Sequence, residues 1–103
     1  MRVLTEGHKY SLANFENGIE AQTIQFIEKQ PSINSTFKLE TVHDGTTNEE
    51  VLAMLIDRLQ FLGEKLPCRE NSIAITKCEE ALMWLNKRTA ERKARGVEGT
   101  RLA

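Results

Sequence analysis

Residues 44–50 read Asp44-Gly45-Thr46-Thr47-Asn48-Glu49-Glu50, and the character of the sequence changes at this point. A threonine followed three residues later by a glutamate is the pattern of a capping box, in which the two side chains satisfy free N–H groups at the start of a helix. The pair therefore predicts a helix that begins at about Asn48 and runs to about Glu64. The Asp-Gly dipeptide before it is typical of a turn and predicts the end of the preceding region.

A second helix is predicted after the first. Pro67 interrupts the helical pattern, and a new helical stretch begins near Cys68 and continues to Arg95, where Gly96 provides a C-terminal stop. Because only a few residues join the two helices, they must be antiparallel neighbours. The sequence from residue 44 onward thus predicts an αα hairpin with a long second helix, followed by a short loop.

The region before residue 44 reads as short strands. Four short stretches separated by turn residues are predicted as strands: Arg2–Glu6, Tyr10–Phe15, Thr23–Lys29, which is rich in β-branched and aromatic residues, and Phe37–Val42. The loops are too short to hold crossover helices, so we expect three or four antiparallel strands with a break at Pro31. The predicted fold is α+β: a small N-terminal antiparallel β-sheet (1–43) packed on the C-terminal hairpin (44–103), in one domain.

Composition excludes several classes of protein. The chain has 103 residues and a net charge of −1, with 4 basic and 8 acidic residues up to Glu50 and 10 basic and 7 acidic residues from Val51 onward. This basic excess is too small for general nucleic-acid binding, so DNA is not expected as a partner, although a local anion site is allowed. No apolar run approaches the ~18 residues of a membrane span, and no secretory signal precedes Leu4. We expect no membrane partner and a cytoplasmic location.

The sequence lacks the motifs of an enzyme. His8 and His43 are far apart, and Cys68 and Cys78 have no close histidine, so neither a metal site nor a cofactor is expected. Both cysteines read as reduced thiols. A nucleophilic Cys68 at a helix start has no obvious base beside it. We therefore expect a protein that is not an enzyme.

The first helix has a second apolar face. A stripe of aliphatic side chains defines its core face: Leu52, Leu55, Ile56, Leu59 and Leu62. Phe61 falls roughly 180° from Leu52, with Met54 and Arg58 beside it. Packing of Phe61 on the sheet or on a second subunit is one interpretation. A stacking platform for a flat base, next to a cation, is the other.

The core face of the second helix changes into a row of cations. Its apolar stripe comprises Ala74, Cys78, Ala81, Leu82 and Leu85. Arg88 and Arg92 continue this stripe, with Arg95 about 60° to one side. A solvated charged helix end is one explanation. Forked binding of phosphate, for which arginine is well suited, is the other.

The segment after the second helix is the most specific local string, Ala94-Arg95-Gly96-Val97-Glu98-Gly99-Thr100. Two glycines three residues apart favour tight turns whose exposed N–H groups can hold an anion. A helix stop followed by a tail explains the same residues equally well.

Helix geometry separates these candidate residues within one chain. Asn71 lies near Phe61 at the turn of the hairpin, whereas Arg88 lies about 25 Å further along the second helix. One small ligand cannot reach both ends. A two-fold dimer of antiparallel hairpins would bring them together in a pocket between subunits, although nothing in the sequence requires it.

Several stretches of this chain resemble one known family, the phage Thoeris anti-defence (anti-Thoeris, Tad) proteins. The resemblance extends over essentially the whole chain and is carried by Asp44-Gly45-Thr46-Thr47-Asn48-Glu49-Glu50, Leu66-Pro67-Cys68-Arg69-Glu70-Asn71, Glu79-Glu80-Ala81-Leu82-Met83-Trp84-Leu85 and Arg88-Thr89-Ala90-Glu91-Arg92-Lys93-Ala94-Arg95-Gly96-Val97-Glu98-Gly99-Thr100. The hairpin is shared more loosely with a phage anti-CBASS protein that sequesters cyclic nucleotides.

The resemblance implies a sponge that evades host immunity. Family members bind glycocyclic ADP-ribose made by bacterial TIR-domain Thoeris proteins and do not cleave it, so the immune effector stays inactive in the host bacterial cytoplasm. The alternative is sequestration of CBASS cyclic dinucleotides or trinucleotides, additionally or instead. The family fold is a small β-sheet on an αα hairpin, assembled as a homodimer and in some cases as a hexamer.

The resemblance also assigns roles to individual residues. It implies that Phe61 stacks on adenine, that Asn71 hydrogen-bonds the ligand, and that Arg88 and Arg92 hold the phosphates. The loop that closes over the site is a weaker assignment and comprises Arg95, Gly96, Glu98, Gly99 and Thr100. Arg101-Leu102-Ala103 departs from the family pattern.

Overall fold

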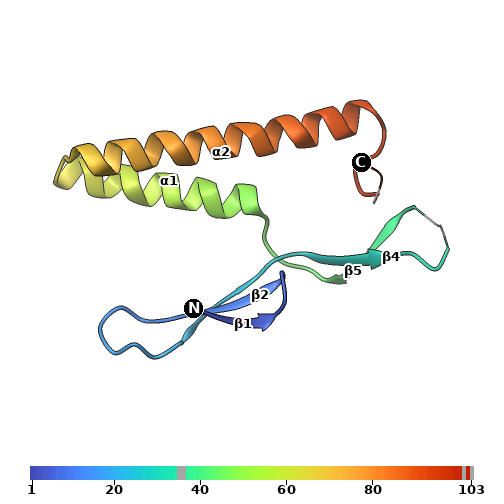
Figure 1. Cartoon of the computed structure of the whole chain (residues 1–103), viewed down its shortest axis with the longest axis horizontal. Coiled ribbons are helices and arrows are strands. Elements are labelled where there is room, and N and C mark those ends of the chain that lie inside the picture. Colours follow the sequence, from blue (N-terminus) through green and yellow to red (C-terminus); the bar gives the residue numbers. More distant parts are fainter. Residues whose placement is uncertain (35–36, 101, 103) are drawn as a thin grey trace. The chain divides into compact units, whose positions relative to one another are not determined.

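The computed structural model describes residues 1–34, 37–100 and 102, and the chain divides into two compact units, Met1–Thr47 and Asn48–Ala103. Within the described residues, five β-strands lie in the first unit and two α-helices in the second (Figure 1). The α+β class and the C-terminal helical hairpin predicted from the sequence are confirmed.

Three strands of the first unit form one antiparallel sheet. They are β1 (Arg2–Thr5), β2 (Lys9–Leu12) and β3 (Gln22–Gln25), hydrogen-bonded in that order. A tight turn joins β1 to β2, in which the His8 N–H donates to the Thr5 carbonyl at 2.9 Å. The first two predicted strands are therefore present, with shorter ends.

The stretch Thr23–Lys29, predicted as one strand, is divided between two sheets. Its beginning belongs to β3, and its end begins β4 (Glu28–Pro31). β4 pairs antiparallel with β5 (Leu39–His43) in a separate two-stranded sheet. Between the two strands, Phe26 forms a parallel bridge with Thr46.

Main-chain hydrogen bonds show why this strand divides. The Phe26 N–H donates to the His8 carbonyl at 2.7 Å, in the register of the first sheet. The next residue changes partner, because the Ile27 N–H donates to the Thr46 carbonyl at 2.9 Å. The Thr46 N–H in turn donates to the Gln25 carbonyl at 2.9 Å. The single sheet of three or four strands expected from the sequence is thus replaced, in the part of the chain that is described, by a sheet of three and a sheet of two.

Gly45 allows this close approach. A Cβ atom at position 45 would lie 2.3 Å from the Gln25 carbonyl oxygen and 2.7 Å from the Phe26 carbonyl carbon. No side chain can be accommodated without moving the backbone. The Asp-Gly turn predicted at this point therefore also lets the chain lie against β3.

Pro31, expected to break the chain between strands, is the last residue of β4 and pairs with Leu39. Proline has no N–H to donate, so it is tolerated at a strand end. The next main-chain bond is donated by the Ser32 N–H to the Lys38 carbonyl at 2.9 Å.

The second unit is an antiparallel helical hairpin of α1 (Asn48–Lys65) and α2 (Arg69–Ala94). Both begin and end within one residue of their predicted bounds. Cys68 caps α2, because its backbone is extended and its Sγ accepts the Asn71 N–H at 3.4 Å. Neither helix, over the residues described, is long and apolar enough to cross a membrane.

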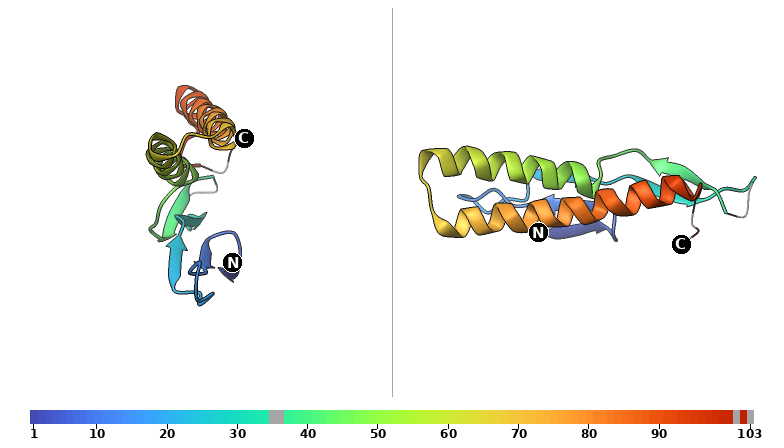
Figure 2. Two further views of the ribbon diagram at one scale, coloured as in Figure 1. Left: turned by 90° about the vertical axis from the view of Figure 1, so that its left-hand side faces the viewer. Right: turned by 90° about the horizontal axis from the view of Figure 1, so that it is seen from above.

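α2 is the longer helix, with 26 residues against 18 in α1. Figure 2 shows the two helices side by side, with the C-terminal end of α2 extending past the start of α1. This confirms the overhang expected from the predicted helix lengths. The C-terminal end of α2 consequently has no partner helix within the hairpin.

A Schellman motif ends α2. Gly96, with a φ of 73°, donates its N–H to the Lys93 carbonyl at 3.1 Å, and the Val97 N–H donates to the Arg92 carbonyl at 3.0 Å. These two bonds satisfy carbonyls that a helix end otherwise leaves free. The predicted stop at Gly96 is confirmed.

The interface between α1 and α2, here called the seam, is only partly shielded from solvent. Most of the predicted core stripe of α1 is half-buried, but Leu55 is 39 % exposed, and Ala81 of α2 is also exposed. Among the described residues no apolar side chain is fully buried, whereas Met54, Phe61 and Trp84 are each more than half exposed. Two helices alone cannot enclose a core, so a large apolar surface stays open to solvent in the single chain.

Candidate ligand-binding site

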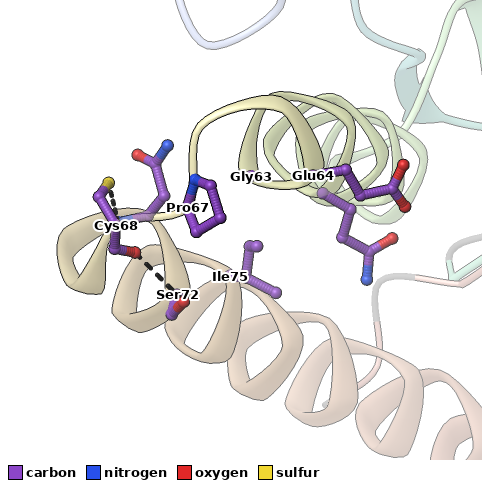
Figure 3. A pocket seen from close by; sticks show the side chains of 8 residues that line it. Gly63, Glu64, Pro67, Cys68, Ser72 and Ile75 are labelled. Atoms are coloured by element: carbon purple, nitrogen blue, oxygen red, sulfur yellow. Dashed lines mark hydrogen bonds between the residues drawn. The ribbon is translucent and has the colours of Figure 1, made fainter.

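A cavity lies at the turn of the hairpin and has a volume of about 510 Å³. It is lined by both helices and by the turn between them: Gln60, Gly63, Glu64, Pro67, Cys68, Asn71, Ser72 and Ile75. Figure 3 shows the Ile75 side chain pointing from α2 toward α1, with Glu64 on the facing helix. The cavity therefore combines an apolar floor with carboxylate, hydroxyl and amide groups.

The start of α2 fixes the wall of this cavity. The Cys68 carbonyl accepts hydrogen bonds from both the Ser72 N–H and the Ser72 Oγ, each at 3.2 Å (Figure 3). Asn71 donates its main-chain N–H to the Cys68 Sγ, so its side-chain amide is not needed for capping. Asn71, predicted as a ligand residue, is thus held half-buried in the lining.

Phe61 lies on α1 close to this cavity but is not part of its lining. Its side chain is 54 % exposed, and the Lys65 Nζ lies 4.9 Å from the ring centroid. An ammonium over an aromatic face is a cation–π contact. Helix periodicity predicted Arg58 beside Phe61 but not Lys65, although the i, i+4 spacing could have indicated this lysine.

The arginines of α2 lie at the other end of the hairpin. Arg88 follows Asn71 by about 25 Å along one continuous helix. Within a single chain the structure therefore brings Phe61 and Asn71 to one end, and Arg88 and Arg92 to the other. No single small ligand can contact both groups of one chain.

Arg88 is exposed, contrary to the expectation that it continues the buried face. The physical reason is the overhang, since α1 begins at Asn48 and does not extend along this part of α2. Arg88 makes no hydrogen bond or ion pair with the residues that the structure describes. Its guanidinium is consequently open to an external anion.

Arg92, by contrast, is buried, with only 6 % of its surface exposed. It does continue the buried face, but the loop after α2 covers it. Its Nε donates to the Glu98 Oε2 at 3.2 Å, and its Nη2 donates to the carbonyls of Val97 at 2.9 Å and Thr100 at 2.8 Å. Its Nη1 donates to the Leu102 carbonyl.

The loop itself is built by two glycines with positive φ. Gly96 ends the helix, and Gly99, with a φ of 81°, lies in a turn closed by the Thr100 N–H, which donates to the Val97 carbonyl at 3.1 Å. The N–H groups of Gly96, Val97 and Thr100 are all used inside the chain. These bonds agree with the interpretation of a helix stop. The ion pair with Glu98 was not foreseen, and no periodic pattern in the sequence indicates it.

Comparison with known proteins identifies the family. Residues 18–90 match the family described as Acb2/Tad1, hairpin domain, which covers β3 to β5, both helices up to Ala90, and three of the predicted ligand residues, Phe61, Asn71 and Arg88. Arg92 and the loop lie beyond the matched residues.

A curated relative supports the same assignment. The chain is 55 % identical over 78 residues to "Thoeris anti-defense 1" of Bacillus phage SBSphiJ7. This alignment covers 73 % of the chain and 55 % of the relative, so the chain spans little more than half of that protein's length. From the matched hairpin and this identity, the chain belongs to the Acb2/Tad1 hairpin family, among the anti-Thoeris phage proteins.

Proposed function

We propose that the protein is a sponge for glycocyclic ADP-ribose, the cyclic ADP-ribose-type signal of TIR-domain Thoeris proteins. It binds the nucleotide in the host cytoplasm and does not cleave it. Removal of the free nucleotide keeps the immune effector inactive. The observation that carries this proposal is that the hairpin of an anti-Thoeris family member presents both an exposed aromatic ring and an exposed guanidinium that has no partner among the described residues.

Each end of the hairpin suits one part of this nucleotide. The Phe61 ring, 54 % exposed, offers a flat face for stacking of the adenine, and Asn71 offers an amide for its polar edge. Arg88 offers the fork geometry that matches a phosphate. These groups supply stacking, hydrogen bonding and charge, which are the interactions that a base and a diphosphate require.

The site is complete only in a homodimer. Because the two groups lie about 25 Å apart in one chain, an antiparallel pair of hairpins is needed to place Arg88 of one subunit near Phe61 of the other. The exposed apolar side chains support such an assembly, since a second copy would cover surface that one chain leaves open. Two equivalent pockets would follow from the two-fold symmetry.

The affinity for the nucleotide must be high, because a sponge does not turn over and competes with the host receptor for each nucleotide molecule. A binding free energy of about 10–12 kcal/mol, corresponding to a Kd between tens of nanomolar and nanomolar, is sufficient. A stacked base and several charge-assisted hydrogen bonds, shielded from water between subunits, can supply this free energy.

Titration calorimetry with glycocyclic ADP-ribose tests the proposal. We expect Phe61→Ala and Arg88→Ala to abolish measurable binding while circular dichroism and sedimentation stay unchanged. Matched controls are Phe15→Ala, which removes a fully exposed ring, and Lys93→Ala, which removes a cation near the same helix end. Both controls should bind like the parent protein. Binding of a cyclic trinucleotide in place of glycocyclic ADP-ribose would contradict the proposal.

A further inference from the structure

One carboxylate lies in the lining of the cavity at the hairpin turn. Among the described residues that line this cavity, Glu64 carries the only formal charge, and Gln60, Asn71 and Ser72 supply neutral polar groups. The Glu64 carboxylate makes no hydrogen bond or ion pair within the part of the chain that the structure describes. Its two oxygens can therefore accept hydrogen bonds from a ligand in the cavity.

The position of Glu64 in α1 is unfavourable for a carboxylate. Glu64 is the last residue but one of α1, and the negative end of a helix dipole lies at the C-terminus. A second negative charge at this end destabilises the helix. The neighbouring cation does not offset it, because Lys65 places its ammonium over the Phe61 ring. Helix stability therefore does not explain this carboxylate, whereas a role toward a ligand does.

Two side chains with complementary hydrogen-bonding properties lie near the Phe61 ring. Glu64 follows Phe61 by three residues, so the two are neighbours on the surface of α1. Asn71 contributes to the same cavity lining from α2. A carboxylate only accepts hydrogen bonds, whereas an amide also donates them. The edge of adenine carries an amino donor beside a ring nitrogen that accepts, and these two side chains match that pair.

We propose that Glu64 is a specificity-determining residue whose carboxylate accepts a hydrogen bond from the exocyclic amino group of the bound base. The site therefore selects an amino-bearing purine over the purine with an oxo group at the same position, because an oxo group would place two acceptors together without a donor. The same charge repels a phosphate from the turn of the hairpin. This inference rests on the proposed function, which supplies the base stacked on Phe61.

Titration calorimetry with two nucleotides tests the proposal: glycocyclic ADP-ribose and its deaminated form, in which hypoxanthine replaces adenine. We expect the parent protein to bind the adenine nucleotide at least about tenfold more tightly. In Glu64→Gln this preference should fall to within about threefold, because an amide can also donate to the oxo group. Equal affinities of the parent protein for the two nucleotides would overturn the proposal, and so would an undiminished preference in Glu64→Gln.

Glu70→Gln is the matched control, because it removes an exposed carboxylate at the same end of the hairpin but outside the cavity lining. It should keep the preference of the parent protein. Thermal unfolding gives a second readout. Glu64→Gln removes a charge from an unfavourable helix end and should have an equal or higher Tm, whereas Glu70→Gln removes one from the favourable first turn of α2 and should have a lower Tm. The reverse order of Tm values would show a structural role for Glu64 and overturn the proposal.

The same titrations separate failure of this inference from failure of the proposed function. A parent protein that binds neither nucleotide would reject both. A parent protein that binds both nucleotides equally would reject the inference alone, since capture would remain. Loss of both nucleotides in a folded Glu64→Gln variant would also overturn the inference, because the amide still accepts a hydrogen bond and should keep the adenine nucleotide bound.

Discussion

The Lys65 ammonium lies 4.9 Å from the centroid of the Phe61 ring, one helical turn further along α1. This contact covers one face of the ring and leaves the aromatic side chain 54 % exposed. If a base stacks on the ring, Lys65 holds the ring from the opposite side. In the proposed site, the stacking platform would therefore comprise both Phe61 and Lys65.

We expect Lys65→Met to weaken capture of glycocyclic ADP-ribose by about two- to fivefold, because an exposed cation–π contact contributes roughly 0.5–1 kcal/mol. Titration calorimetry measures the change. Lys87→Met is the matched control, since Lys87 lies 5.2 Å from the Trp84 ring in a similar contact elsewhere on the hairpin. Equal affinities for the two variants would show that Lys65 plays no part in the platform.

Gly45→Ala should destabilise the protein by about 1–3 kcal/mol, the usual cost of forcing extra atoms into a packed site. The new Cβ would lie 2.3 Å from the Gln25 carbonyl oxygen, so the bridge at Thr46 has to move. Gly63→Ala is the control, because a Cβ there meets nothing within 4 Å and alanine favours a helix. Thermal unfolding should show a lower Tm for the first variant and an equal or higher Tm for the second. A lower Tm for Gly63→Ala than for Gly45→Ala would contradict the close approach of Gly45 to the Gln25 carbonyl.

Cys68→Ser should raise the Tm. Serine is a preferred N-cap residue and would accept the Asn71 N–H more strongly than the thiol does at 3.4 Å. The expected gain is below about 1 kcal/mol, and Cys68→Ala should lose stability by a similar amount. Cys78→Ser is the comparison, since Cys78 is half-buried in the seam and caps no helix. A higher Tm for Cys78→Ser, without a higher Tm for Cys68→Ser, would contradict the capping role of Cys68.

Sedimentation should give at least twice the chain mass of 11.7 kDa, because in the proposed homodimer a second copy would cover the apolar side chains that one chain leaves exposed. The Tm should rise with protein concentration, as expected when folding is coupled to association. A monomer whose Tm does not depend on concentration would contradict the composite site.

The sequence was most informative where local rules decide the structure. The capping pattern at Thr47 and Glu50 and the stop at Gly96 located the ends of the helices to within one residue. Helix periodicity also placed Phe61 away from the seam, where its ring is exposed. These features depend on residues close together in the chain.

Features that depend on distant residues were not predictable in the same way. The division of Thr23–Lys29 follows from bonds to Thr46, about twenty residues later, and periodicity cannot show a change of strand partner. The exposure of Arg88 depends on where α1 begins, and the burial of Arg92 depends on how the loop folds back. One helix face therefore holds two arginines with opposite environments.

A sponge differs from an enzyme in that it captures its nucleotide intact. The most direct test is to incubate the protein with glycocyclic ADP-ribose, remove the protein by filtration, and measure the nucleotide in the filtrate and in the heated protein fraction. We expect the filtrate to be depleted and heating to release intact glycocyclic ADP-ribose. Nucleotide left in the filtrate would contradict binding, and recovery of only a hydrolysed product would show an enzyme instead of a sponge.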